Sequence, residues 1–175
     1  MNFDVFGGFE IHRKSNRHGV FDKAFWERVR ASEPLLPDAC GCYVFAVKNG
    51  QNIVAWYVGK TEKNTFQREC FQATKVNYYN DVFASKNGTL LLFLLPRKTG
   101  SNRKFSKPTK TGYRDIDFLE SMLIGIALER NSSLMNVKKT KMLREMHVPG
   151  VINSPIGHPP TRVADLRNAL GISGS

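Results

Sequence analysis

The feature that most constrains this chain is a pair of apolar, β-rich runs separated by a short polar segment. The runs cover residues 40–47 and 53–61, and the segment between them contains Asn49-Gly50. A short loop carrying Asn-Gly between two such runs is a strong signal for a β-hairpin. The sequence therefore predicts two adjacent antiparallel strands, around which the other elements pack.

Each predicted strand carries one tyrosine, and the register of the hairpin decides whether the two meet. Tyr43 and Tyr57 are equally far from Gly50 along the chain. A three- or five-residue loop centred on Gly50 would place them opposite each other, whereas a two-residue Asn49-Gly50 loop would pair Tyr43 with Trp56. Both registers stay open at this point. Two ordinary, half-buried strand tyrosines are the alternative to a functional pair.

The charge balance of the chain points to a polyanionic partner. There are 26 Lys and Arg against 15 Asp and Glu, a formal net charge of +11. Such an excess favours DNA, RNA or an acidic membrane surface. The three cysteines fit neither a disulfide framework nor a complete zinc site and suit a reducing cytoplasm. The longest apolar run, residues 90–96, is too short to cross a bilayer. We therefore expect a cytoplasmic protein without a membrane span.

The pattern predicts one core with an extension at each end. The expected divisions are an N-terminal extension over residues 1–37, a core over 38–137 and a basic C-terminal extension over 138–175. Asp22 is a plausible N-cap for a short helix in the first extension. The basic cluster before it is either an arm that touches a polyanion or a solvated terminus. Thr161 is the expected cap of a last helix over residues 162–170.

Within the core, a helix and a third strand follow the hairpin. A turn after Gly59 leads into a helix through Phe66, Cys70 and Phe71, and Arg68 lies on this helix. Residues 89–95 then read as a buried strand. Two strands, a helix and a third strand predict a small sheet with a helix packed on it.

Residues 97–114 are basic and contain no acidic residue. Small and polar residues supply most of the remainder, which is typical of a flexible loop. We favour phosphate contact over a solvated insertion, because each neutralised phosphate would release counterions. The candidate nucleic-acid-binding residues are Arg97, Lys98, Arg103, Lys104, Lys107, Lys110 and Arg114.

A helix predicted over residues 118–130 carries an acid in an apolar setting. At 100° per residue, a wide apolar arc is formed by Phe118, Leu119, Met122, Leu123, Ile126 and Ala127. Glu120 projects at about 200°, between Ala127 and Ile124. A carboxylate there is costly unless it is paired, hydrogen-bonded or bound to a cation. Alternatively, Asp117 caps the helix and Glu120 completes a capping box.

At this point the residues resemble the GIY-YIG nuclease family. The tripeptides Gly41-Cys42-Tyr43 and Tyr57-Val58-Gly59 are similar to the two signature tripeptides of that family. The resemblance covers about residues 38–137, and the family's later positions are matched in order by Lys60, Arg68, Glu120 and Asn136. Two positions depart from the family pattern. Cys42 replaces the usual aliphatic residue, and Gln72 stands where many members carry a histidine or tyrosine.

The resemblance implies an α+β fold, a small three-stranded antiparallel sheet flanked by helices, and metal-dependent hydrolysis of phosphodiesters. Glu120 would hold one Mg²⁺ or Mn²⁺ ion. Tyr43 would be the base and Tyr57 the second ring, although the two roles are exchangeable. Lys60, Arg68 and the metal would lower the pKa of the base. Arg68 would also hold the phosphate. Gly41 and Gly59 would shape the backbone, and Asn136 would orient backbone or neighbouring groups.

The leading hypothesis is therefore a one-metal endonuclease acting on double-stranded DNA. One alternative is a nucleic-acid-binding module that keeps this fold without activity, and another is a nuclease directed at RNA. Double-strand cutting by a single-site enzyme would favour a homodimer or two successive nicks.

Overall fold

The computed structural model describes residues 2–12, 24–100, 104–136, 138–148, 151 and 161–171, and for some residues of the last two helices only the backbone. They fall into two compact units, residues 1–136 and 137–175, each described here by itself. Asp22, the expected helix cap, and Arg103, one of the candidate basic residues, lie outside the described residues.

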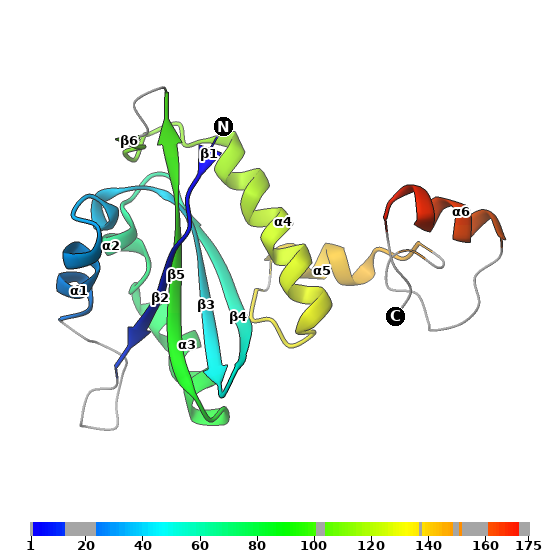
Figure 1. The fold of residues 1–175 in the computed structure, drawn as a ribbon, viewed down its shortest axis with the longest axis horizontal. Coiled ribbons are helices and arrows are strands. Elements are labelled where there is room, and N and C mark those ends of the chain that lie inside the picture. Colours follow the sequence, from blue (N-terminus) through cyan, green and yellow to red (C-terminus); the bar gives the residue numbers. More distant parts are fainter. Residues whose placement is uncertain are drawn as a thin grey trace. The chain divides into compact units, whose positions relative to one another are not determined.

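The first unit is an α+β structure whose elements alternate irregularly along the chain (Figure 1). Its elements, in chain order, are β1 (Asn2–Phe3), β2 (Phe6–Ile11), α1 (Phe25–Ser32), the 3₁₀ helix η1 (Leu36–Asp38), β3 (Gly41–Asn49), β4 (Asn52–Thr61), α2 (Phe66–Glu69), α3 (Ala73–Ser85), β5 (Thr89–Thr99), β6 (Lys104–Phe105) and α4 (Arg114–Arg130).

A single antiparallel sheet runs through this unit. Its main order is β1-β5-β3-β4, and β2 and β6 also pair with β5. The hairpin strands β3 and β4 pair with each other, and β5 pairs with the other edge of β3. Consequently β3 is an interior strand and β4 is an edge strand.

The sheet has six strands, so the prediction of three strands was wrong. The predicted three are the β3, β4 and β5 part of the sheet. The additional strands come from residues 2–11, expected in an N-terminal extension, and from residues 104–105 within the basic segment. Strand β5 is longer than the expected residues 89–95, and an exposed edge of that length is a liability that proteins cover. The N-terminal strands cover it here.

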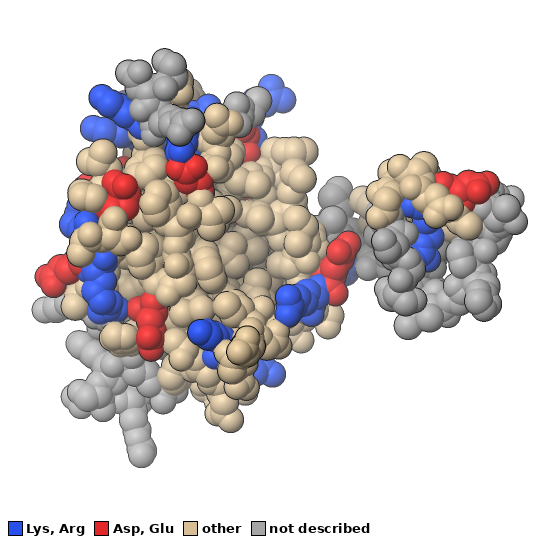
Figure 2. All heavy atoms as spheres, viewed as in Figure 1, with Lys and Arg blue, Asp and Glu red and all other residues tan. Residues whose placement is uncertain are grey.

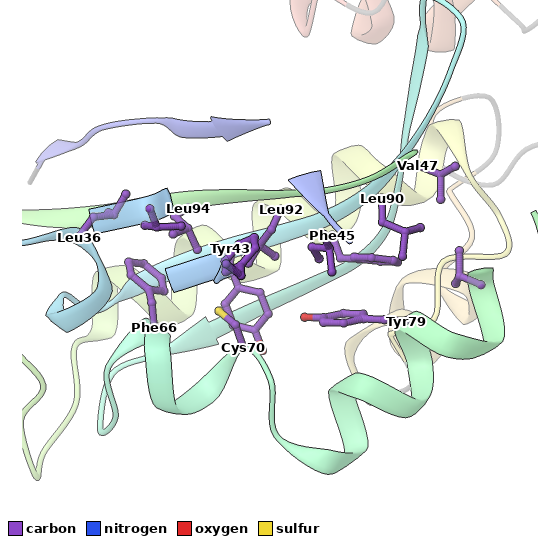
Figure 3. Close-up of a cluster of buried hydrophobic side chains, with 14 of the residues drawn as sticks. Leu36, Tyr43, Phe45, Val47, Phe66, Cys70, Tyr79, Leu90, Leu92 and Leu94 are labelled. Atoms are coloured by element: carbon purple, nitrogen blue, oxygen red, sulfur yellow. The ribbon is translucent and has the colours of Figure 1, made fainter. Parts of the chain in front are cut away.

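Helices cover both faces of the sheet. Side chains of β3 alternate between the faces, with Tyr43, Phe45 and Val47 on one and Cys42 on the other. The first face carries the main core, to which α1, α2 and α3 contribute Phe25, Phe66 and Tyr79, among others (Figure 3). Cys42 packs instead with a side chain of α4. Strand β3 is therefore buried on both sides.

Two helices stand where a single helix through residues 66–71 was predicted. Thr65 begins the short helix α2 by accepting a hydrogen bond from the Arg68 amide through its hydroxyl. Gln72 is extended and starts the longer α3, so the chain turns between the two. This turn brings Tyr79 of α3 onto Phe45 of β3, with ring centroids 4.2 Å apart.

The second unit contains α5 (Lys138–Glu145) and α6 (Thr161–Ala169). The predicted last helix, residues 162–170, is thus offset from α6 by one residue. Helices in the described part of the chain are all too short or too polar to cross a membrane.

Candidate functional site

The hairpin places Tyr43 opposite Gly59, not opposite Tyr57 or Trp56, so both predicted registers were wrong. Asn49 pairs with Asn52 across the turn, and the ladder is regular as far as Ala46 and Ala55. A bulge then adds Trp56 to β4 and shifts the partner of every earlier residue of β3 by one. The two tyrosines become diagonal neighbours on one face, with ring centroids 6.1 Å apart.

Both glycines of the tripeptides stand where another chain segment comes very close. A Cβ on Gly59 would lie 2.5 Å from the Tyr43 hydroxyl oxygen and closer still to the ring. A Cβ on Gly41 would overlap the Leu95 carbonyl oxygen on the neighbouring strand. Gly59 is therefore the surface on which the Tyr43 ring lies, and Gly41 allows β3 and β5 to meet.

Tyr43 is fully buried, and its position argues against the role of base that was first assigned to it. The side chain is 0% exposed, and its hydroxyl has no hydrogen-bond partner among the described residues. Burial and the neighbouring Tyr79 raise the pKa of Tyr43 well above its usual value of 10. A phenol in this position cannot reach a hydrated phosphate without a rearrangement of the core.

Tyr57 is the accessible member of the pair. Its side chain is partly exposed on the edge strand β4, and its ring also contacts Tyr78 of α3 at 5.5 Å between centroids. Burial raises the pKa of Tyr57 to about 12, and the charge of Glu120 adds to this shift. Neither Lys60 nor Arg68 is among the largest contributions to the pKa of Tyr57. Of the two tyrosines, Tyr57 is the one whose pKa the charge of Glu120 raises.

Glu120 lies on the buried side of α4. The helix begins at Arg114 with Tyr113 as its N-cap, so Asp117 is inside the first turn and is not the cap. Ile116 and Ile124, one helical turn before and after Glu120, are both buried, and α4 makes its most extensive contacts with β4. Glu120 itself is only partly buried. A carboxylate thus faces the sheet between two buried isoleucines, beside the strand that carries Tyr57.

The opposite side of α4 is exposed, although the predicted apolar arc includes it. Leu119 and Leu123 pack against the sheet, whereas Phe118, Met122 and Ile126 project into solvent. The buried side of this helix is therefore the side that carries Ile116 and Ile124, and not the middle of the apolar arc predicted from the sequence.

Lys60 fastens α4 to the end of β4. Its ammonium group forms salt bridges with Glu62 at 3.1 Å and with Asp117 at 2.7 Å. Burial by itself would lower the pKa of Lys60, but the hydrogen bonds to Asp117 and Glu62 outweigh it and raise the pKa. Glu62 also accepts a hydrogen bond from the Tyr113 amide at the start of α4. The interactions of Lys60 therefore hold in place the helix that carries Glu120.

Arg68 is exposed on α2. Within the described part of the chain, its guanidinium group makes no hydrogen bond or ion pair. This leaves all its donors available to a ligand, which is what a phosphate-binding arginine requires.

Asn136 is buried and holds the backbone of β4. Its amide nitrogen donates to the Val58 carbonyl at 2.6 Å, and its amide oxygen accepts from the Val58 N–H at 2.9 Å. These two bonds satisfy the free backbone groups of an edge strand directly beside Tyr57.

Glu69 was missed in the sequence and lies close to the tyrosines. It forms a salt bridge with Lys75 at 3.3 Å and accepts a hydrogen bond from the Gln72 amide at 2.9 Å. Its charge raises the pKa of Tyr57 and of Tyr43, after larger contributions from burial. In the sequence, its position directly after Arg68 on a predicted helix is what could have indicated it.

The basic segment divides into paired and unpaired residues. Arg97 forms a salt bridge with Asp115 at 2.7 Å and stacks over the Tyr113 ring, and Lys98 pairs with Asp4. These two largely buried cations hold the fold together, so the sequence assignment of both to nucleic-acid binding is not supported by their geometry. Exposed side chains without a partner among the described residues remain at Lys104, Lys107, Lys110 and Arg114.

The donor set fits a metal that needs few protein ligands. Among the described residues, no group of three or more His, Cys, Asp or Glu side chains is arranged to hold an ion. Mg²⁺ is commonly held by one or two carboxylates plus waters and substrate phosphate. Glu120 supplies one hard oxygen donor, and the negative potential that it and Glu69 impose on Tyr57 is one that a cation would relieve. A hollow of about 480 Å³ elsewhere, between β2 and the hairpin turn, is lined by none of the candidate residues.

Comparison with known proteins gives no match: no protein-family model, curated protein or solved structure is detectably similar to this chain.

Proposed function

We propose that this chain is a metal-dependent endonuclease that hydrolyses phosphodiester bonds in DNA. The observation that carries the proposal is that an accessible phenol, Tyr57, lies on the edge strand against which the helix carrying Glu120 packs. The charge of the Glu120 carboxylate also contributes to the raised pKa of Tyr57. The tripeptide resemblance and the net charge of +11 support the same activity.

Each proposed role follows from the environment of a side chain. Tyr57 takes the proton of the attacking water as its phenolate, after its own proton has passed to solvent, because Tyr43 is too deeply buried to do so. A cation near Glu120 would favour that phenolate. Arg68, with its donors free, holds the scissile phosphate. Lys60 and Asn136 are positioning residues, since one fixes α4 and the other fixes β4.

Glu120 would hold one divalent cation, Mg²⁺ or Mn²⁺. When bound, the cation supplies charge stabilisation for the phosphoryl oxygens and offsets the negative charge that raises the pKa of Tyr57. The unpaired side chains of Lys104, Lys107 and Lys110 would bind the flanking backbone phosphates.

The test is cleavage of supercoiled plasmid with Mg²⁺, with Mn²⁺ and with a chelator. Glu120→Gln runs beside Glu27→Gln, which removes the same charge from an exposed position on α1. We expect nicked or linear product that requires both the metal and Glu120, with Glu27→Gln as active as the parent. Cleavage that survives in Glu120→Gln would reject the proposed site.

A nucleic-acid-binding module without activity is the second candidate, favoured by the four unpaired basic side chains. It predicts salt-dependent binding to the same plasmid with no product in any metal. Structured DNA and then RNA would be tested before that outcome is accepted, because a nuclease with a narrow substrate would also fail on plasmid.

A further inference from the structure

The outward face of α4 carries a stripe of large apolar side chains. Phe118, Met122 and Ile126 follow one another at intervals of one helical turn and are 68%, 50% and 63% exposed. In Figure 2 the charged side chains of the first unit gather mostly at its margins, and its right-hand part, over which α4 runs in Figure 1, is mostly uncharged. Contiguous exposed apolar surface of this kind marks a binding surface.

The charges at the two ends of the stripe indicate which kind of partner binds there. Arg114 precedes Phe118 by one turn, and Glu129 follows Ile126 by three residues. Both are exposed, and neither has a partner among the described residues. Their neighbours are engaged elsewhere, Asp115 with Arg97 and Arg130 with Asn52. One end of the face therefore has an unpaired positive charge and the other an unpaired negative charge.

We propose that this stripe packs antiparallel against the same stripe of a second copy of the chain. With the two-fold axis at Met122, Phe118 lies opposite Ile126 of the second copy. The same register brings Arg114 within one residue of Glu129 of the second copy, twice per dimer by symmetry. Gly125 lies on the same face and a Cβ there would meet nothing within 4 Å, so the helices can approach closely. This inference does not depend on the nuclease proposal.

The stripe is smaller than a standard interface, which buries about 800 Å² per partner. We therefore expect a weak dimer, with a dissociation constant of roughly micromolar order. Sedimentation of the full chain, without nucleic acid, should show a monomer–dimer equilibrium in this range. A chain that stays monomeric up to about a hundred times that concentration would overturn the proposal.

Cysteine cross-linking tests the register. The three native cysteines are buried, so single exposed cysteines report on the stripe alone. Met122→Cys lies on the axis and should form a dimeric disulfide under mild oxidation. Phe118→Cys should not link to itself, because its two copies are about 12 Å apart along the helix axis. It should link to Ile126→Cys when the two proteins are mixed. Self-linking of Phe118→Cys in preference to Met122→Cys would reject the antiparallel arrangement.

Charge reversal tests the ends. Arg114→Glu or Glu129→Arg should each weaken the dimer by about tenfold, since like charges then face each other. The double variant restores opposite charges and should recover the parent affinity to within about threefold. Failure of the double variant to recover would show that these two residues do not meet.

Discussion

The interior around Tyr43 and the rim around Tyr57 use the same residue type for opposite purposes. Tyr43 packs on Gly59, and its hydroxyl has no hydrogen-bond partner within the described residues. Tyr57, on the neighbouring strand, is partly exposed and feels the charge of Glu120. Their rings are only 6.1 Å apart. One diagonal step across a hairpin thus separates a packing residue from a residue that a substrate can reach.

The cause of this difference is the position of the two strands in the sheet. Strand β3 is flanked by β4 and β5 and covered on both faces, so its large apolar side chains between residues 42 and 47 become core. Strand β4 has one free edge, which Asn136 occupies beside Val58. Function is therefore expected on β4, and the predictions below test that assignment.

The largest expected effect is on cleavage. Tyr57→Phe should lower the rate by at least about 100-fold, the usual contribution of a general base. Tyr43→Phe should change the rate by no more than a few-fold and should leave the free energy of unfolding unchanged or slightly higher. The reason is that it removes a buried hydroxyl without a hydrogen bond.

Single-turnover cleavage and urea unfolding of both variants measure this pair. The reverse outcome, with Tyr43→Phe inactive but folded and Tyr57→Phe active, would return the role of base to Tyr43.

Sequence reasoning reached much of the fold because its strongest signals are local. The Asn-Gly turn predicted the hairpin, and the apolar run at residues 89–95 predicted β5. The pairing of β1 and β2 with β5 could not be predicted in this way. It joins residues 79 to 96 positions apart, and Gly7-Gly8 gives residues 6–11 a weak strand pattern. The bulge at Trp56 was equally hidden, since no local rule fixes where a ladder shifts.

The second effect is on stability. Gly59→Ala should lower the free energy of unfolding by about 2–3 kcal/mol, because the new methyl group would overlap the Tyr43 ring. Gly125→Ala is the matched control. It adds the same methyl group in open space on a helix and should raise stability by about 0.5–1 kcal/mol.

Denaturant unfolding at low protein concentration measures both glycine variants in the monomer. Equal stabilities of the two would mean that Tyr43 does not pack on Gly59.

The third effect depends on pH. The pKa of Tyr57 is about 12 in the folded protein, against 10 for an ordinary tyrosine. The unfolded chain therefore releases this proton first, and the stability that Tyr57 contributes is fully present below pH 10. That stability is lost as the pH rises from about 10 to 12. We expect a loss of about 2 kcal/mol from this residue.

Tyrosinate absorbance and unfolding measured across this range give the result. Tyr57→Phe should remove the first tyrosine transition of the buried pair, because Tyr43 has its pKa raised further by deeper burial. If that transition were lost in Tyr43→Phe instead, Tyr43 and not Tyr57 would be the tyrosine of the pair with the lower pKa.

The sequence proposed the residues of the candidate site through its family resemblance, but it could not assign their roles. Tyr57 and Glu120 were both named in that way, and in the structure the charge of Glu120 contributes to the raised pKa of Tyr57. The roles of these residues depend on burial, which is a property of the tertiary structure. Tyr43 is buried away from solvent, and Arg97 forms a salt bridge with Asp115. Lys60 is likewise held by Asp117, a residue 57 positions away.

The smallest expected effect is on nucleic-acid binding by single surface cations. Lys107 is exposed, and its carbonyl accepts a hydrogen bond from the Tyr113 hydroxyl, which places the lysine near the start of α4, the helix that carries Glu120. Lys107→Ala should reduce the slope of log affinity against log salt by about one, and the affinity by only a few-fold.

Lys48→Ala removes the same charge beside the hairpin turn, at the opposite end of β3, and should leave the slope unchanged. Fluorescence anisotropy with a labelled duplex at several salt concentrations separates the two. Equal slopes in both variants would mean that binding follows net charge and not position. The surface around Tyr57 would then no longer be supported as the place where nucleic acid binds, although Tyr57 and Glu120 would remain the residues to test for catalysis.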